Sequence, residues 1–195
     1  MMNKKEKIVY AAIEVFQEKG VEKTKISDIV KLAGIAQGTF YLYFPSKLSV
    51  MPAIAEVMVE KMILAVKEKV QNDSPFSSKV EQVIDAVFTF IAEYREIQAL
   101  MYAGLASTEH IKEWEAVYEP LYIWLSDFLS EAKESGEIRD SVHAERTAKL
   151  FIALVESAAE QVYLYDHKDD EQVELQKAEV LDFLTHALHN KEVVR

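Results

Sequence analysis

The 195-residue sequence contains no cysteine, only five glycines and four prolines, and no long apolar run. Without cysteine, disulfide bonds, thiolate metal sites and cysteine-based redox sensing are excluded. No apolar stretch approaches the roughly 18 residues that a membrane span requires. Lysines precede an apolar run at the N-terminus, as in a signal peptide, but Glu14 interrupts that run and no small-residue cleavage site follows. We therefore expect a cytoplasmic protein with no membrane partner.

The few glycines and prolines fall mostly where helices are expected to end, and no alternating strand pattern of useful length is present. Apolar residues recur at helical spacing instead, as Ile8, Ala12 and Phe16 do near the N-terminus. The sequence therefore predicts an all-α fold of about nine helices. Their approximate ranges are 4–19, 28–33, 36–44, 47–70, 75–94, 96–106, 109–135, 143–166 and 170–190.

Several residues predict where these helices begin or bend. Ser46 is placed to cap the fourth helix, and Ser74 to cap the fifth with Pro75 at its first position. Pro52 and Pro120 fall inside predicted helices, where each removes a backbone donor and is expected to produce a kink.

Charge is distributed unevenly along the chain. The net charge is −11, but residues 1–50 hold eight lysines against five acidic residues. The N-terminal part is therefore cationic although the whole chain is acidic, which indicates a small cationic module on an acidic body. We expect a DNA-binding domain at residues 1–46 and a helical effector-binding and dimerisation domain at 47–195.

Two short predicted helices, separated by a tight turn at Gly34, have the lengths of a helix-turn-helix. Glycine suits this turn because it adopts positive φ without steric cost. In the second of these helices Phe40 and Phe44 are four residues apart, so they share one face and can anchor the helix. The other side displays Gln37, Gly38, Thr39 and Tyr43.

The stretch TKISDIVKLAGIAQGTFYLYFPSKLSV resembles the DNA-binding segment of TetR-type transcriptional repressors. The resemblance covers about residues 5–50 and implies a homodimer, whose last two helices form a four-helix interface, with a small-molecule pocket among the middle helices. Lys25, where a small hydroxyl residue is common, and Pro52, early in the fourth helix, depart from the family pattern. The matching positions are Thr24, Asp28, Ile29, Val30, Ala33, Gly34, Gly38, Thr39, Phe40, Tyr41, Phe44 and Lys47.

These patterns assign roles to the residues expected at the DNA. Gln37 can pair with an adenine edge, and Thr39 can donate, accept or touch a thymine methyl. Ala36 and Gly38 carry no hydrogen-bonding side chain, and their small size lets the backbone approach the groove. The resemblance implies phosphate contacts by the hydroxyls of Tyr41 and Tyr43, and Lys25 and Lys47 are also expected to contact phosphates.

The larger domain carries two further sets of candidates. Ligand pockets are mainly apolar with a few placed polar groups, and the candidates to line one are Tyr94, Gln98, Tyr102, Tyr118 and Tyr122. A wide apolar stripe over about residues 143–190 is expected to form the dimer interface. Its members are Leu150, Phe151, Leu154, Val155, Ala158, Ala159, Val162, Tyr163, Val180, Leu181, Leu184 and Leu188.

No metal, cofactor or catalytic site is predicted. None of the five histidines has a glutamate three residues before it, as a helical di-iron site requires. The polar residues at 166–170 are best explained as a solvated turn.

The sequence predicts a repressor that binds double-stranded DNA at a palindromic operator as a dimer and is released by a small apolar or amphipathic effector. Two alternatives remain, namely a DNA-binding regulator without an effector and a helical-bundle enzyme with a degenerate N-terminal module.

Overall fold

The computed structural model describes residues 2–99, 111–166 and 169–189, and within them the all-α prediction is confirmed. Apart from a single β-bridge between Ile138 and His189, these residues form helices, turns and loops. None of the described helices combines the length and apolar composition needed to cross a bilayer. Two compact units are present, and the chain passes from the first to the second within one helix, after Glu60.

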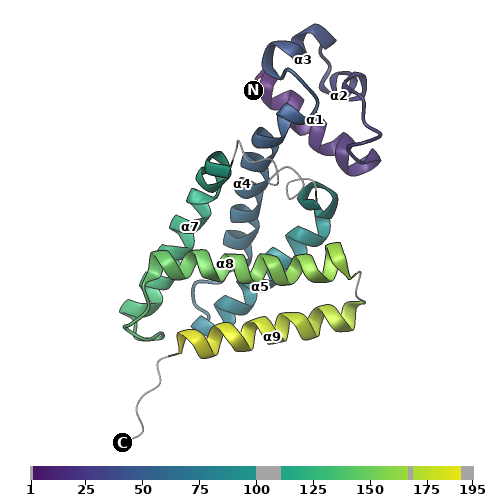
Figure 1. The fold of residues 1–195 in the computed structure, drawn as a ribbon. Helices are drawn as coiled ribbons and strands as arrows, with labels where there is room; N and C mark the ends of the chain where they lie inside the picture. The colour runs from purple at the N-terminus through teal and green to yellow at the C-terminus, as the bar shows by residue number, and fades with distance from the viewer. Residues whose placement is uncertain (1, 100–110, 167–168, 190–195) are drawn as a thin grey trace, which may run out of the picture. The chain divides into compact units, whose positions relative to one another are not determined.

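The first unit holds the three N-terminal helices that Figure 1 shows together, α1, α2 and α3. The N-terminus of α1 is closed by Asn3 and Glu6, each of whose side chains accepts the backbone N–H of the other. Gly34 ends α2 with φ 64°, as predicted, and its N–H donates back to the carbonyls of Val30 and Lys31. The elements are α1 (Lys4–Lys19), α2 (Ile26–Ala33), α3 (Gln37–Tyr43), a 3₁₀ turn η1 (Leu48–Val50) and the start of α4 (Met51–Lys69).

The fourth helix is predicted to begin at residue 47, but the structure has a 3₁₀ turn there, followed by α4. Ser46 and Ser49 cap each other, since each backbone N–H donates to the other's hydroxyl, but these bonds close the 3₁₀ turn η1 and not α4, which Ser46 is predicted to cap. The α-helix itself begins only at Met51, so Pro52 lies in its first turn. A first-turn proline needs no intrahelical donor, and the predicted reason for a kink at Pro52 therefore does not apply.

The second unit is built from the end of α4, from α5 (Phe76–Glu93), most of α7 (Ile111–Glu134), α8 (Ala144–Glu160), a π-helical turn η2 (Gln161–Tyr165) and α9 (Asp170–Leu188). α8 and α9 lie side by side, and α5 packs against both (Figure 1). α7 is continuous through Pro120.

Three helix boundaries after α4 differ from the prediction or lie partly outside the described residues. The helix expected over 143–166 becomes the π-helical turn η2 after Glu160. α5 begins after Pro75, and the N–H of its first residue, Phe76, donates to the distant carboxylate of Glu137, so the predicted start with Ser74 as the cap is wrong. Most of the helix expected at 96–106 lies outside the described residues, although 95–99 are helical.

Most of the predicted dimer stripe is buried within the chain. Ala158 and Ala159, which the stripe includes, are buried within the chain and therefore do not face a partner helix. Leu150 of α8 is 71% exposed, and Phe183 of α9, which the stripe omitted, is 63% exposed. The stripe members buried within the chain are Phe151, Val155, Ala158, Ala159, Val162, Val180, Leu184 and Leu188.

Candidate DNA-binding and effector sites

The short helix α3 is held by its two phenylalanines. Phe40 and Phe44 are buried, and their ring centroids lie 5.8 Å apart. The ring of Tyr41 meets Phe40 edge-on at 5.7 Å between centroids, although Tyr41 itself is largely exposed. These contacts fix one face of α3 in the core of the first unit and leave the opposite face in solvent.

The structure exposes most of the residues predicted for DNA contact. Thr39 is half-buried. Gly38 faces open space, since a Cβ added there would have no neighbouring group within 4 Å. Leu42 is absent from the predicted set although it is the most exposed of the large apolar side chains described, and its position opposite Phe40 on a helix could have revealed it. The exposed members of the predicted set are Lys25, Ala36, Gln37, Gly38, Tyr41 and Tyr43.

Lys47 is bonded inside the first unit. Its ammonium group donates to the backbone carbonyl oxygens of Val21 and Thr24, the latter at 2.8 Å. Thr24 is buried, and its hydroxyl donates to the carbonyl of Gly20 at 2.8 Å, at the end of α1. Two of the three N–H donors of Lys47 are therefore used to hold the segment after α3 against the α1–α2 turn. Phosphate binding by Lys47 stays a prediction, with one donor left for it.

The start of α2 has its own electrostatic support. The carboxylate of Asp28 accepts the backbone N–H of Lys25 at 2.9 Å and lies 3.4 Å from the ammonium group of Lys19. The hydrogen bond from Lys25, with the nearby lysine charges, lowers the pKa of Asp28. Asp28 supplies the side-chain acceptor at this terminus, and the side chain of Lys25 is exposed.

The residues predicted to line an effector pocket fall in both units. In the first unit Gln98 is buried and Tyr94 half-buried, one helical turn apart. In the second unit Tyr118 and Tyr122 of α7 stack at 5.9 Å, and the ammonium group of Lys149 lies 4.8 Å from the ring centre of Tyr122. Tyr102 lies outside the described residues.

Tyr118 also contacts an acidic pair buried on α8. Its hydroxyl donates to Oε1 of Glu156 at 3.2 Å, and Glu156 and Glu160 are both buried one turn apart. Burial raises the pKa of Glu156 to about 8, and the charge of Glu160 adds to the rise, while the Tyr118 hydrogen bond opposes it. Glu156 is therefore mainly protonated at neutral pH, a state in which a carboxyl group can donate as well as accept.

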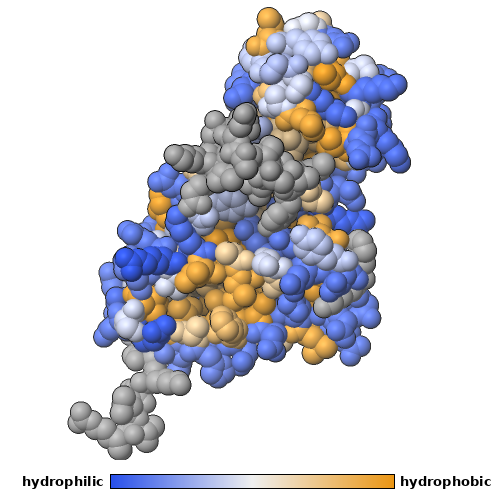
Figure 2. Space-filling model, in the orientation of Figure 1, coloured by the Kyte–Doolittle hydropathy of each residue, from blue (hydrophilic) through white to orange (hydrophobic). Residues whose placement is uncertain are grey.

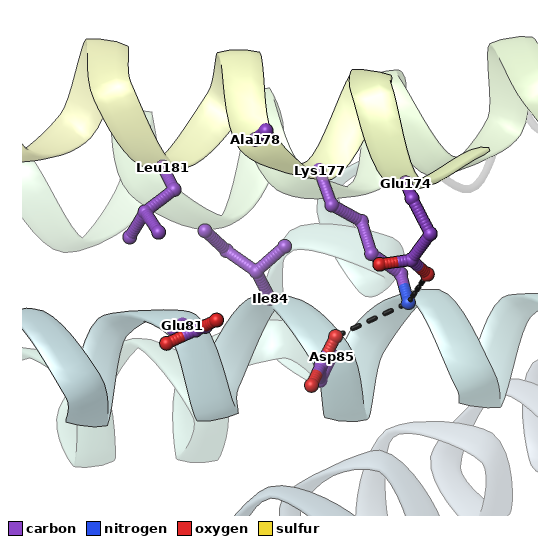
Figure 3. Close-up of a pocket in the computed structure, with 7 residues that line it drawn as sticks. All are labelled: Glu81, Ile84, Asp85, Glu174, Lys177, Ala178 and Leu181. Carbon is purple, nitrogen blue, oxygen red and sulfur yellow. Dashed lines mark hydrogen bonds and ion pairs between the residues drawn. The ribbon is translucent and has the colours of Figure 1, made fainter. Parts of the chain in front are cut away.

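A small surface hollow lies between α5 and α9 (Figure 3). At its edge the Lys177 ammonium group lies 3.1 Å from Asp85 and 2.7 Å from Glu174. Partial burial favours the neutral amine, but these carboxylates outweigh it and raise the pKa of Lys177. The hollow has a volume of about 110 Å³, well below the roughly 300 Å³ at which small-molecule sites begin. The Lys177–Asp85 ion pair links α9 to α5, whereas Glu174 lies on the same helix as Lys177. No group of three potential metal ligands occurs among the described residues.

Comparisons with known proteins agree with this architecture. Residues 8–54 match the family described as "Bacterial regulatory proteins, tetR family", and residues 80–188 match the "Tetracyclin repressor-like, C-terminal domain". The chain is 41% identical over 185 residues, 95% of each chain, to the helix-turn-helix transcriptional regulator YvdT of Bacillus subtilis. It is 25% identical over 186 residues to the fatty acid metabolism regulator protein of the same organism, covering 94% of this chain and 95% of that protein.

Two solved structures share the fold at lower identity. Bacillus subtilis FadR in complex with stearoyl-CoA is 23% identical with a TM-score of 0.73, over 94% of this chain and 98% of that one. Thermus thermophilus FadR in complex with lauroyl-CoA is 20% identical with a TM-score of 0.75, over 98% of each chain.

Glu156 predicts a pH-dependent stability. The folded chain holds a proton on Glu156 up to about pH 8, whereas an unfolded chain releases it near the ordinary pKa of 4.5. Between these values the free energy of unfolding falls as pH rises, by at most about 1.4 kcal/mol per pH unit for one proton. Glu156→Gln stays neutral at every pH, so we expect its unfolding free energy to decline less over this range. Urea unfolding of the full chain, followed by tryptophan fluorescence across the same range, measures this slope.

Glu131→Gln, which alters an exposed carboxylate on α7, is the matched control and should keep the slope of the unaltered chain. A Glu156→Gln slope equal to that of the control would mean that Glu156 does not titrate between the two states.

Proposed function

Because the chain belongs to the tetR family of bacterial regulatory proteins, and is thus a DNA-binding transcriptional regulator, we propose that it is an effector-released repressor. It binds a palindromic operator as a homodimer in the cytoplasm, and a small apolar or amphipathic molecule releases it. Residues 1–46 form the DNA-binding domain and 47–195 the effector-binding and dimerisation domain. The observation that carries this proposal is α3, whose anchored face leaves Gln37, Gly38 and Thr39 on the accessible side.

In this proposal α3 enters the major groove and reads few bases. Gln37 pairs with an adenine edge, and Thr39 makes a secondary contact. Exposed Lys25, Tyr41 and Tyr43 contact phosphates, which set the register without reading sequence. The two copies of α3 in a dimer reach half-sites about 34–36 Å apart, or a multiple of that spacing.

Replacing Gln37 with alanine should separate base reading from general DNA affinity. We expect Gln37→Ala to weaken binding to the best operator by about 1–3 kcal/mol and to leave binding to unrelated duplexes nearly unchanged. The measurement is the dissociation constant for specific and random duplexes across a salt series, with the operator selected from random DNA.

Two variants serve as controls for this experiment. Lys25→Ala should weaken both kinds of duplex about equally and reduce the salt slope by about one unit. Gln71→Ala, which alters an exposed glutamine outside the first unit, should change neither. If Gln37→Ala lost affinity equally for both kinds of duplex, the assignment of Gln37 as a base reader would be wrong.

A dimer is supported by the exposed apolar side chains of α8 and α9. Figure 2 shows apolar residues gathered on the face of the second unit that these helices present. Leu150 on α8 and Leu175 and Phe183 on α9 are exposed although they are large and apolar. Exposed apolar patches of this kind mark interaction sites, and a two-fold axis would place the patch against its own copy.

Introducing a charge into this patch should dissociate the dimer. We expect Phe183→Glu to weaken self-association by about 2 kcal/mol or more, because a carboxylate would be buried against apolar side chains. Sedimentation velocity at micromolar concentrations measures the change. Leu64→Glu on α4, an equally apolar and exposed starting residue, is the matched control and should remain dimeric. A monomeric unaltered chain, or dimerisation unaffected by Phe183→Glu, would refute this interface.

Long-chain acyl compounds are the first candidates for the effector, because a fatty acid metabolism regulator is among the relatives and two structural neighbours hold acyl-CoA. Residues 51–195 carry an excess of acidic over basic side chains, which opposes a polyanionic CoA group. The apolar chain of the ligand should therefore supply most of the affinity. Tyr118 and Tyr122, which stack in the second unit, are the residues proposed to line the effector site there.

The effector hypothesis predicts that an acyl compound loosens DNA binding. A ligand shifts the equilibrium only by its difference in affinity for the two states, and such couplings are typically about 5- to 150-fold. We expect stearoyl-CoA or stearate to weaken operator affinity within that range, and coenzyme A alone to have no effect. An acyl compound that binds without changing operator affinity would refute the coupling, and no binding by any of the three would favour the regulator without this effector.

A further inference from the structure

Leu42 is an apolar side chain displayed in solvent at the centre of α3. It is 82% exposed, whereas Phe40, two residues earlier, is completely buried. At about 100° per residue, Leu42 lies about 200° around the helix from Phe40, which places it opposite the anchored face. Its neighbours Tyr41 and Tyr43 are less exposed than Leu42. Nothing in the packing of the first unit therefore requires leucine here.

Leu42 shares its face with residues already placed at the DNA. Gly38 and Thr39 precede it by four and three residues, and side chains at these spacings are neighbours on a helix surface. No side chain projects from this face at Gly38, where the space is open. One turn further along the same face, the side chain of Leu42 projects into solvent. A groove that receives Gly38 and Thr39 necessarily meets Leu42 as well.

We propose that Leu42 is a specificity-determining residue that contacts the C5-methyl group of a thymine in the operator. This inference rests on the proposed function, since it requires α3 to lie in the major groove. Among the features that base pairs present there, the thymine methyl is the apolar one, and the others are hydrogen-bond donors and acceptors. A leucine cannot satisfy those polar groups, but it can bury a methyl. It therefore selects an A·T pair at a position separate from the adenine assigned to Gln37.

The thymine methyl can be removed without altering base pairing by substituting deoxyuridine. In a selected operator, each thymine is replaced in turn, and affinity is measured for the unaltered chain and for Leu42→Ala. We expect one position, repeated in each half-site, where uracil weakens the unaltered chain roughly fourfold per half-site, the loss expected for one buried methyl group. With Leu42→Ala the thymine and uracil operators should bind equally at that position.

Two further variants keep the experiment decisive. Leu42→Met retains an apolar side chain and should preserve the discrimination, and Leu48→Ala, which alters an exposed leucine outside α3, should preserve it in full. If the unaltered chain prefers its operator but Leu42→Ala keeps the same thymine–uracil difference, or weakens all duplexes alike, the inference about Leu42 is wrong while the proposed function stands. If the unaltered chain selects no operator, the proposed function itself fails.

Discussion

The burial of Phe40 and Phe44 is the interaction on which the DNA-binding surface depends. α3 has seven residues, and an isolated helix of that length is not stable in water. Its conformation is therefore maintained by packing, and the two phenyl rings supply that packing on one face. Because a helix is rigid, fixing this face also fixes the direction of every exposed side chain on α3. Gln37, Gly38, Thr39 and Leu42 are presented together because Phe40 and Phe44 are held.

Hydrogen bonds near the α1–α2 turn extend this anchoring to the start of the next helix. Thr24 connects the turn to the end of α1 through its hydroxyl, and its carbonyl accepts a hydrogen bond from Lys47. Lys47 stands just before η1 and α4, so the same bond restrains the exit from the DNA-binding segment. A charged donor on a backbone carbonyl is stronger than a neutral one. The lysine that the family resemblance assigned to phosphate thus has a second, structural set of partners.

In the second unit the buried face of α8 combines apolar packing with carboxyl groups. Phe151, Val155 and Ala159 fill the core, while Glu156 and Glu160 are buried on the same helix. Burying a charge is costly unless it is paired, and Glu156 avoids much of that cost by holding its proton. The result is a polar group with a titratable proton, hydrogen-bonded to Tyr118, within a largely apolar interior. Such a group ties the packing of α7 on α8 to its protonation state.

The sequence by itself determined the helical class, the anchored face of α3 and the turn at Gly34, because these follow from periodicity and local steric preference. Tertiary structure decided the partners of Lys47, the cap of α5 by Glu137, and the burial of Ala158 and Ala159. Each of these depends on residues far apart in the chain, and local spacing contains no information about which distant groups will meet. The period of a helix shows which side chains share a face, but only packing shows whether that face is buried in the chain or left in solvent.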